Sequence, residues 1–190
     1  MKRLLMLFLC IGLIFCMSAC IEPDVSVKKP VIYLYPTEEM NVNVELDYNG
    51  TLTTTYPEYN DGWNVLASPD GTLIDPVTER EYYCLFWEGT SDVEYDFSKG
   101  FVVKREDTRA FLEDSLAKLG LTQKEANEFI IYWLPRLEQN EYNLIAFQDE
   151  VYKENAELII TPAADTTIRV FMAWEGLEEP IEIEPQVLEA

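Results

Sequence analysis

The sequence contains no histidine, and this absence removes much of the chemistry that enzymes commonly use. Ser-His-Asp and Cys-His nucleophile systems, HExxH zinc sites and imidazole proton shuttles all need that side chain. Basic residues are also scarce, because 14 lysines and arginines face 35 aspartates and glutamates, which gives a formal charge of −21 over 190 residues. Since nucleic-acid affinity comes from lysine and arginine contacts with phosphates, no nucleic-acid partner is expected.

Long apolar runs are missing except near the N-terminus. Lys2 and Arg3 precede an uncharged apolar run over Leu4–Met17. This run is shorter than the roughly 20 residues that a membrane-spanning helix needs. A basic start followed by a short apolar run is the pattern of a secretion signal.

The signal ends in Met17-Ser18-Ala19-Cys20, which resembles the lipobox of bacterial lipoproteins. The resemblance implies that residues 1–19 are a signal peptide and that Cys20 becomes the lipidated N-terminus of the mature chain. It also implies a partner, the membrane, and a location in the cell membrane or envelope outside the cytoplasm, although inner and outer membrane stay open. Two or more acyl chains, such as palmitate, would hold the protein stably there. The alternative is a soluble secreted protein with an accidental cysteine at this position.

Cysteines are few, and the lipobox reduces them further. Loss of residues 1–19 removes Cys10 and Cys16, and it changes the formal charge to −23 because Lys2 and Arg3 leave with no acidic residue. If Cys20 carries lipid, Cys84 has no intramolecular partner, so no disulfide framework is expected. Cys84 lies in an apolar run, where a cysteine usually acts as a small buried apolar residue.

The mature chain divides into a tether and one domain. Residues 20–29 are polar after Ile21 and show no helical period, so they predict a lipidated tether. Residues 30–190 predict a single domain that ends in an acidic tail from Pro180. Apolar and alternating patterns predict strands at 31–35, 41–47, 51–56, 63–68, 72–74, 82–87, 101–103, 142–147, 156–161 and 168–174. Asn49-Gly50 and Pro69-Asp70-Gly71 predict two hairpin turns.

The hydrophobic period becomes helical from Asp107. Gly120 occupies the position of a left-handed C-cap after the first helix, and Thr122 and Glu125 have the capping-box spacing that begins a second helix. Pro135 is expected to end or kink that helix. Strands, two helices and further strands together predict an α+β fold, in which a mainly antiparallel β-sheet packs against one inserted helix pair.

Two Trp-Glu-Gly corners are the candidate ligand-binding residues. Trp87-Glu88-Gly89 and Trp174-Glu175-Gly176 each follow an apolar run. If both corners face one cleft, their indoles and carboxylates would suit sugar binding or glycoside hydrolysis. The simpler interpretation makes both tryptophans core residues. Arg169 is a further candidate, because it interrupts an apolar run. It either borders the sheet edge or pairs with a partly buried acid, for which Asp165 and Glu175 are candidates, and the functional interpretation is that it binds an anion.

Several blocks together resemble an uncharacterised family of bacterial secreted and lipoprotein domains marked by the string KPVIYLYP, here Lys29–Pro36. The resemblance extends over residues 29–175, including the blocks at Gly62–Val65, Leu85–Gly89 and Tyr132–Pro135, and implies no activity. No cofactor, metal or catalytic residue is predicted. We therefore expect a membrane-anchored extracytoplasmic lipoprotein that acts in binding or envelope interaction, with a carbohydrate or protein partner, rather than an enzyme. A carbohydrate-binding or glycoside-hydrolysing lipoprotein is the alternative, and the oligomeric state stays open.

Overall fold

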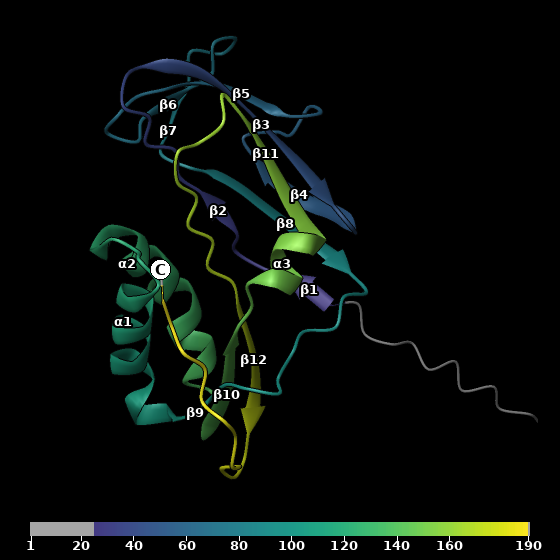
Figure 1. Ribbon diagram of the computed structural model, residues 1–190, viewed down its shortest axis with the longest axis vertical. Helices are drawn as coiled ribbons and strands as arrows, with labels where there is room; N and C mark the ends of the chain where they lie inside the picture. Colours follow the sequence, from purple (N-terminus) through teal and green to yellow (C-terminus); the bar gives the residue numbers. More distant parts are fainter. Residues whose placement is uncertain (1–24, 190) are drawn as a thin grey trace, which may run out of the picture.

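The computed structural model describes residues 25–189 (Figure 1). The predicted signal peptide over residues 1–19 and Cys20 lie outside the described residues. The strands are β1 (Val25–Val27), β2 (Val31–Ile32), β3 (Met40–Tyr48), β4 (Thr51–Tyr56), β5 (Trp63–Ala67), β6 (Leu73–Ile74), β7 (Glu81–Tyr82), β8 (Leu85–Ser91), β9 (Phe101–Lys104), β10 (Tyr142–Phe147), β11 (Ala156–Thr161) and β12 (Met172–Leu177). The helices are α1 (Thr108–Lys118), α2 (Gln123–Leu137) and α3 (Glu150–Asn155), and a 3-10 turn at Arg105–Asp107 precedes α1.

The strands form three antiparallel sheets. One sheet has the order β11-β3-β5-β6-β7, a second has β12-β10-β9, and in the third β8 pairs with β1, β2 and β4. The pairings between named strands are antiparallel, and α1 and α2 are inserted between β9 and β10. The predicted α+β class with mainly antiparallel sheet and an inserted helix pair is therefore confirmed.

Two apolar clusters hold these elements together. The first, here called the sheet core, lies between the sheets of β3 and β8 and contains Val44, Trp63, Leu73, Leu85 and Trp87. The alternation predicted for residues 41–47 supplies it, because Val42, Val44 and Leu46 all point inward. Burial of each such side chain stabilises the fold by about 1.5–3 kcal/mol.

The second cluster, here called the helix core, lies where α1 and α2 cover the sheet of β9, β10 and β12. It contains Leu112, Leu116, Leu137, Ile145 and Met172. In Figure 1 this part lies below the strands of the sheet core, and the yellow C-terminal segment runs beside it. The two cores are therefore separate, although the sequence predicts one domain with one sheet.

Gln148 joins the chain segments that run between the two cores. Its side-chain amide donates to the Asp96 carbonyl at 2.7 Å and accepts from the Asp96 amide at 3.1 Å. Its backbone amide donates to the Phe171 carbonyl at 2.9 Å. Gln148 is 5% exposed, so these hydrogen bonds satisfy a buried side-chain amide. They also hold together the three chain segments that contain Asp96, Gln148 and Phe171.

Several predicted boundaries are wrong. Val25–Val27, which lie inside the predicted tether, form β1 and pair with β8. Three apolar runs predicted as strands are strands only in part. The run over 31–35 contains β2, the run over 82–87 contains the end of β7 and the start of β8, and the run over 168–174 contains the start of β12. Asn49-Gly50 does not close a hairpin either, since β4 pairs with β8 while the Asn49 amide donates to the Asn155 carbonyl.

The helix pair follows its sequence signals more closely. Gly120 has φ +85°, as a left-handed C-cap requires, and the capping box between Thr122 and Glu125 is present. Pro135 does not end α2, which continues to Leu137.

The capping box allows a direct test of helix stability. Thr122→Ala is expected to lower the free energy of unfolding by about 1 kcal/mol, because the Thr122 side chain accepts a hydrogen bond from the Glu125 amide. Urea unfolding followed by circular dichroism measures the loss. Thr122→Ser keeps the accepting oxygen and should retain most of the stability. Equal losses in both variants would show that the cap contributes little.

Candidate functional site

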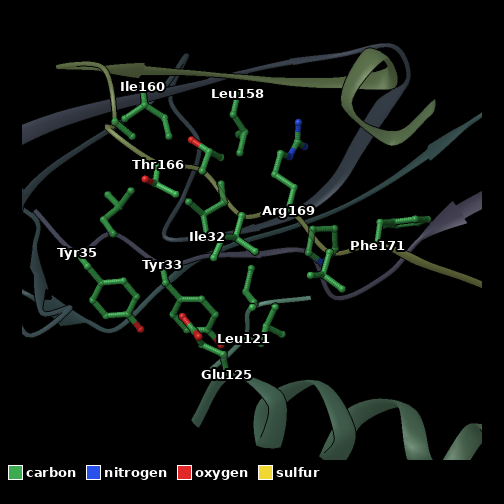
Figure 2. A pocket seen from close by; sticks show the side chains of 18 of the residues that line it. Ile32, Tyr33, Tyr35, Leu121, Glu125, Leu158, Ile160, Thr166, Arg169 and Phe171 are labelled. Carbon is green, nitrogen blue, oxygen red and sulfur yellow. The ribbon is translucent and has the colours of Figure 1, made fainter. Parts of the chain in front are cut away.

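A cavity of about 620 Å³ separates the sheet core from the helix core (Figure 2). Its walls come from the KPVIYLYP segment, β3, the start of α2, β11 and the connection between β11 and β12. Apolar side chains make most of this surface, among them Ile32, Leu158, Ile160 and Phe171. A concave, largely apolar space of about 300–1,000 Å³ with few polar groups is the usual form of a small-molecule site.

Lys29, the first residue of the KPVIYLYP segment, anchors one wall of the cavity. Its φ of 62° is unusual for a residue other than glycine and costs about 1–3 kcal/mol, so neighbouring groups must hold it. Its amide donates to Glu88 at 3.3 Å, and its Nζ lies 3.8 Å from the Glu128 carboxylate. The same ammonium is 5.9 Å from the ring centroids of both Phe86 and Tyr132. Lys29 therefore ties the segment to β8 and to α2.

Tyr33 and Tyr35 follow β2 and face α2. Their rings are stacked, with centroids 6.4 Å apart and planes 14° apart. Burial, followed by the nearby negative charges, raises the pKa of Tyr33, and burial together with the Glu125 carboxylate raises the pKa of Tyr35. Both phenols therefore stay neutral donors near pH 7. The buried Tyr33 hydroxyl has no hydrogen-bond partner among the described residues.

Arg169 lies on the opposite side of the cavity from Glu125 (Figure 2). It belongs to the connection between β11 and β12, not to the strand predicted there. Its guanidinium carbon is 4.4 Å from the ring centroid of the buried Tyr152. Among residues 25–189 no acidic residue forms an ion pair with Arg169, so the predicted pairing with Asp165 or Glu175 is absent.

The comparisons with known proteins place the chain in a family without assigning it an activity. A Butyrivibrio fibrisolvens protein described as "Uncharacterized protein in bglA 3'region" is 42% identical over 81 residues, which is 41% of this chain and 82% of that protein. This chain belongs to the family of that protein. No protein-family model and no solved structure match it. Because the printed description of the Butyrivibrio relative states no ligand or reaction, the chemistry of the site has to be argued from its residues.

The two Trp-Glu-Gly corners do not come together. Trp87 is 1% exposed within the sheet core, whereas Trp174 packs against the helix core from β12. Glu88 pairs with Lys28 at 3.4 Å, and Glu175 is exposed on β12. None of these four residues lines the cavity, and Arg169 alone among the candidate ligand-binding residues does.

Each glycine of these corners has a packing reason. A Cβ at Gly89 would lie 2.5 Å from the ring of Tyr48, which also packs on Trp87 with centroids 4.9 Å apart. A Cβ at Gly176 would lie 2.5 Å from the Asn140 side chain. The repeated tripeptide therefore arises from two unrelated close contacts, and a sugar site built from both corners has no support in their placement.

Sequence reasoning did not select Tyr33, Tyr35, Leu158 or Ile160 as site residues. The alternation of tyrosine with aliphatic residues in KPVIYLYP is the available signal, but the apolar run predicts a strand over 31–35. In the structure Ile32 and Leu34 are buried, while Tyr33 is only partly buried and Tyr35 is 50% exposed. The segment leaves the sheet after Ile32 because its tyrosines pack toward α2.

Cys84 lies near this wall and is a free cysteine. Burial raises the pKa of its thiol, although the charge of Lys29 acts in the opposite direction. A thiol with a raised pKa is a poor nucleophile. Cys84 is only partly buried and belongs to neither core, so it is not the fully buried apolar residue that the sequence predicts. Within residues 25–189, no cluster of three or more acidic or cysteine side chains could hold a metal ion, and no helix is long and apolar enough to cross a membrane.

Proposed function

We propose that this protein is a lipid-anchored, extracytoplasmic binding protein that holds a largely apolar small molecule between its two cores. The cavity carries this proposal. Its apolar walls would bury a ligand of low polarity, and the few polar groups at its two ends would fix the ligand's orientation. A binding role also fits a chain without histidine, in which the familiar catalytic arrangements cannot be built.

The anchor in this proposal comes from the sequence. A lipid on Cys20 would place β1 within a few residues of the membrane, since β1 begins at Val25. A domain with 35 acidic residues would be repelled by anionic headgroups within about a Debye length, so its cavity would stay accessible from the aqueous side.

Two neighbouring residues of β11 allow a test of the cavity. Ile160 lines it, whereas Ile159 is 45% exposed and does not line it. Ile160→Trp should fill part of the space and weaken ligand binding at least about tenfold, because extra volume in a packed site displaces the ligand. The probe is the neutral dye N-phenyl-1-naphthylamine, and binding is measured by energy transfer from tryptophan to the dye.

The matched control is Ile159→Trp, which adds the same donor on the other face of the strand and should bind the dye like the wild type. The full chain is used in phosphatidylcholine nanodiscs, with empty nanodiscs as the blank. A wild-type chain that binds no dye, or two variants that bind it equally well, would contradict a ligand in this cavity.

A further inference from the structure

Arg169 is an unneutralised cation in a strongly acidic protein. Ion pairs within residues 25–189 neutralise Lys28, Lys29, Lys99, Lys104, Arg105, Lys118 and Lys153, but none includes Arg169. Its Nη2 atom is buried and has no hydrogen-bond partner among these residues. A guanidinium is a planar cation whose N–H groups only donate hydrogen bonds, so its natural partner is an anionic acceptor. Arg169 as a whole is only partly buried, so it is a partly desolvated cation on the cavity wall that has no counter-ion among the described residues.

The end of the cavity formed by α2 carries acidic side chains. Glu125 and Glu128 line it from α2. Of the two lysines that also line the cavity, Lys29 pairs with Glu128 at 3.8 Å and Lys28 pairs with Glu88 at 3.4 Å. An anionic group would be repelled there and attracted to Arg169. The two ends therefore define one orientation for a ligand that carries a negative charge at one end.

The wall between these ends is apolar. In Figure 2, Ile32 lies between Arg169 and Glu125, whereas Leu158 and Ile160 lie on the Arg169 side of the cavity. A sugar would leave several hydroxyl groups unpaired against such a surface, at a cost of at least about 1 kcal/mol each. A hydrocarbon body would instead gain about 25 cal/mol for each Å² removed from water.

From these observations we infer that the cavity selects an amphipathic monocarboxylate, with its carboxylate on the Arg169 guanidinium and its hydrocarbon body between β11 and α2. The inference rests on the proposed binding function and adds the chemical class of the ligand. Among the cations that line the cavity, Lys28 and Lys29 are in ion pairs, so Arg169 is the one left to match a single negative charge. A guanidinium can hold a carboxylate through two parallel hydrogen bonds. Aliphatic and aromatic acids share this chemistry.

A pair of probes that differ only in charge tests the inference. cis-Parinaric acid and its methyl ester have the same polyene chain, and both accept energy from tryptophan, including Trp133 in the cavity wall. The full chain in phosphatidylcholine nanodiscs should bind the acid at least about tenfold more tightly than the ester, as expected for a hydrogen bond to a charged group. Arg169→Met should remove this preference while leaving ester binding unchanged.

Two further variants test whether the preference for the acid depends on Arg169 itself. Arg169→Lys keeps the charge and should retain part of the preference for the acid. Arg109→Met removes an exposed arginine of α1 that does not line the cavity, and it should leave the preference intact. Competition by decanoate and by 1-naphthylacetate then shows whether the cavity takes an aliphatic or an aromatic acid.

The outcomes separate this inference from the proposed function. Equal binding of acid and ester by the wild type, or a preference that survives in Arg169→Met, would overturn the role of Arg169 but leave a ligand cavity. Failure of both probes to bind would overturn the inference and the binding function together. A preference that is lost in Arg169→Met and kept in Arg109→Met supports the inference.

Discussion

Trp87→Ala is expected to lower the free energy of unfolding by about 3–5 kcal/mol, the usual cost of truncating a fully buried tryptophan. Trp87 is 1% exposed at the centre of the sheet core, on a strand that is paired along both edges. Its ring packs against Tyr48, and this contact would be lost together with the buried area. Urea unfolding of the full chain, followed by circular dichroism, measures the change.

Trp174→Ala is the matched control because it makes the same substitution in the other Trp-Glu-Gly corner. Trp174 is only partly buried and lies on β12, an edge strand of its sheet. The cavity left by its removal is open to water on one side, so we expect less than half the loss seen for Trp87→Ala. Equal losses would mean that the two corners have equivalent structural roles, contrary to their positions in separate cores.

Cys20→Ala is expected to abolish incorporation of labelled palmitate and to release the protein from the membrane fraction. The thiol of Cys20 is the acceptor in the proposed lipidation, and alanine offers no group to acylate. The predicted signal up to Ala19 stays unchanged, so export itself need not be affected. Feeding the labelled fatty acid to cells, followed by gel autoradiography and membrane pelleting, measures both effects.

Cys84→Ala controls for acylation at the other cysteine of the mature chain. Because Cys84 is partly buried, with a thiol whose pKa is raised by burial, its removal should leave labelling at the wild-type level. A wild-type chain that takes up no label, or a Cys20→Ala chain that still takes it up, would contradict the anchor. Neither result would bear on the cavity, so the two parts of the proposed function are tested independently.

Local sequence signals predicted several elements with the same boundaries that the structure shows. The strands β10 and β11 lie at 142–147 and 156–161 as expected, and Thr122 and Glu125 form the predicted capping box. Pro69-Asp70-Gly71 does close a hairpin, since β5 pairs with β6. The capping box and the hairpin form between neighbours in the chain, so the local pattern is sufficient for them. The strands β10 and β11 instead pair with strands that are distant in sequence, and for them the apolar pattern indicates the bounds but not the partner.

The candidate site was not predictable in the same way. An apolar run such as Val31–Tyr35 shows that its residues avoid water, but not whether a neighbouring strand is available to pair with them. Here β8 pairs with only the first two residues of the run, and the tyrosines turn toward α2. The length of a strand therefore depended on a partner that lies more than 50 residues away.

Packing between distant segments also explains why the sequence did not predict where the Trp-Glu-Gly corners and Arg169 lie. Two identical tripeptides suggested one site, yet Trp87 and Trp174 belong to different cores. Arg169 stood out as a charge within an apolar run, but only the fold shows that none of the acidic residues at 25–189 forms an ion pair with it. In so acidic a chain, proximity in sequence says little about which carboxylates reach a given cation.

By itself, the sequence determined the α+β class, the helix pair and the acidic character of the surface, because periodicity, caps and charge are local or additive properties. It also carries the signal for the proposed membrane location, in the residues up to Cys20. Only the tertiary structure decided that the apolar residues divide into two cores, that a cavity lies between them, and that Arg169 and Glu125 lie on opposite sides of it. These features depend on packing between distant segments, which pattern and composition do not specify.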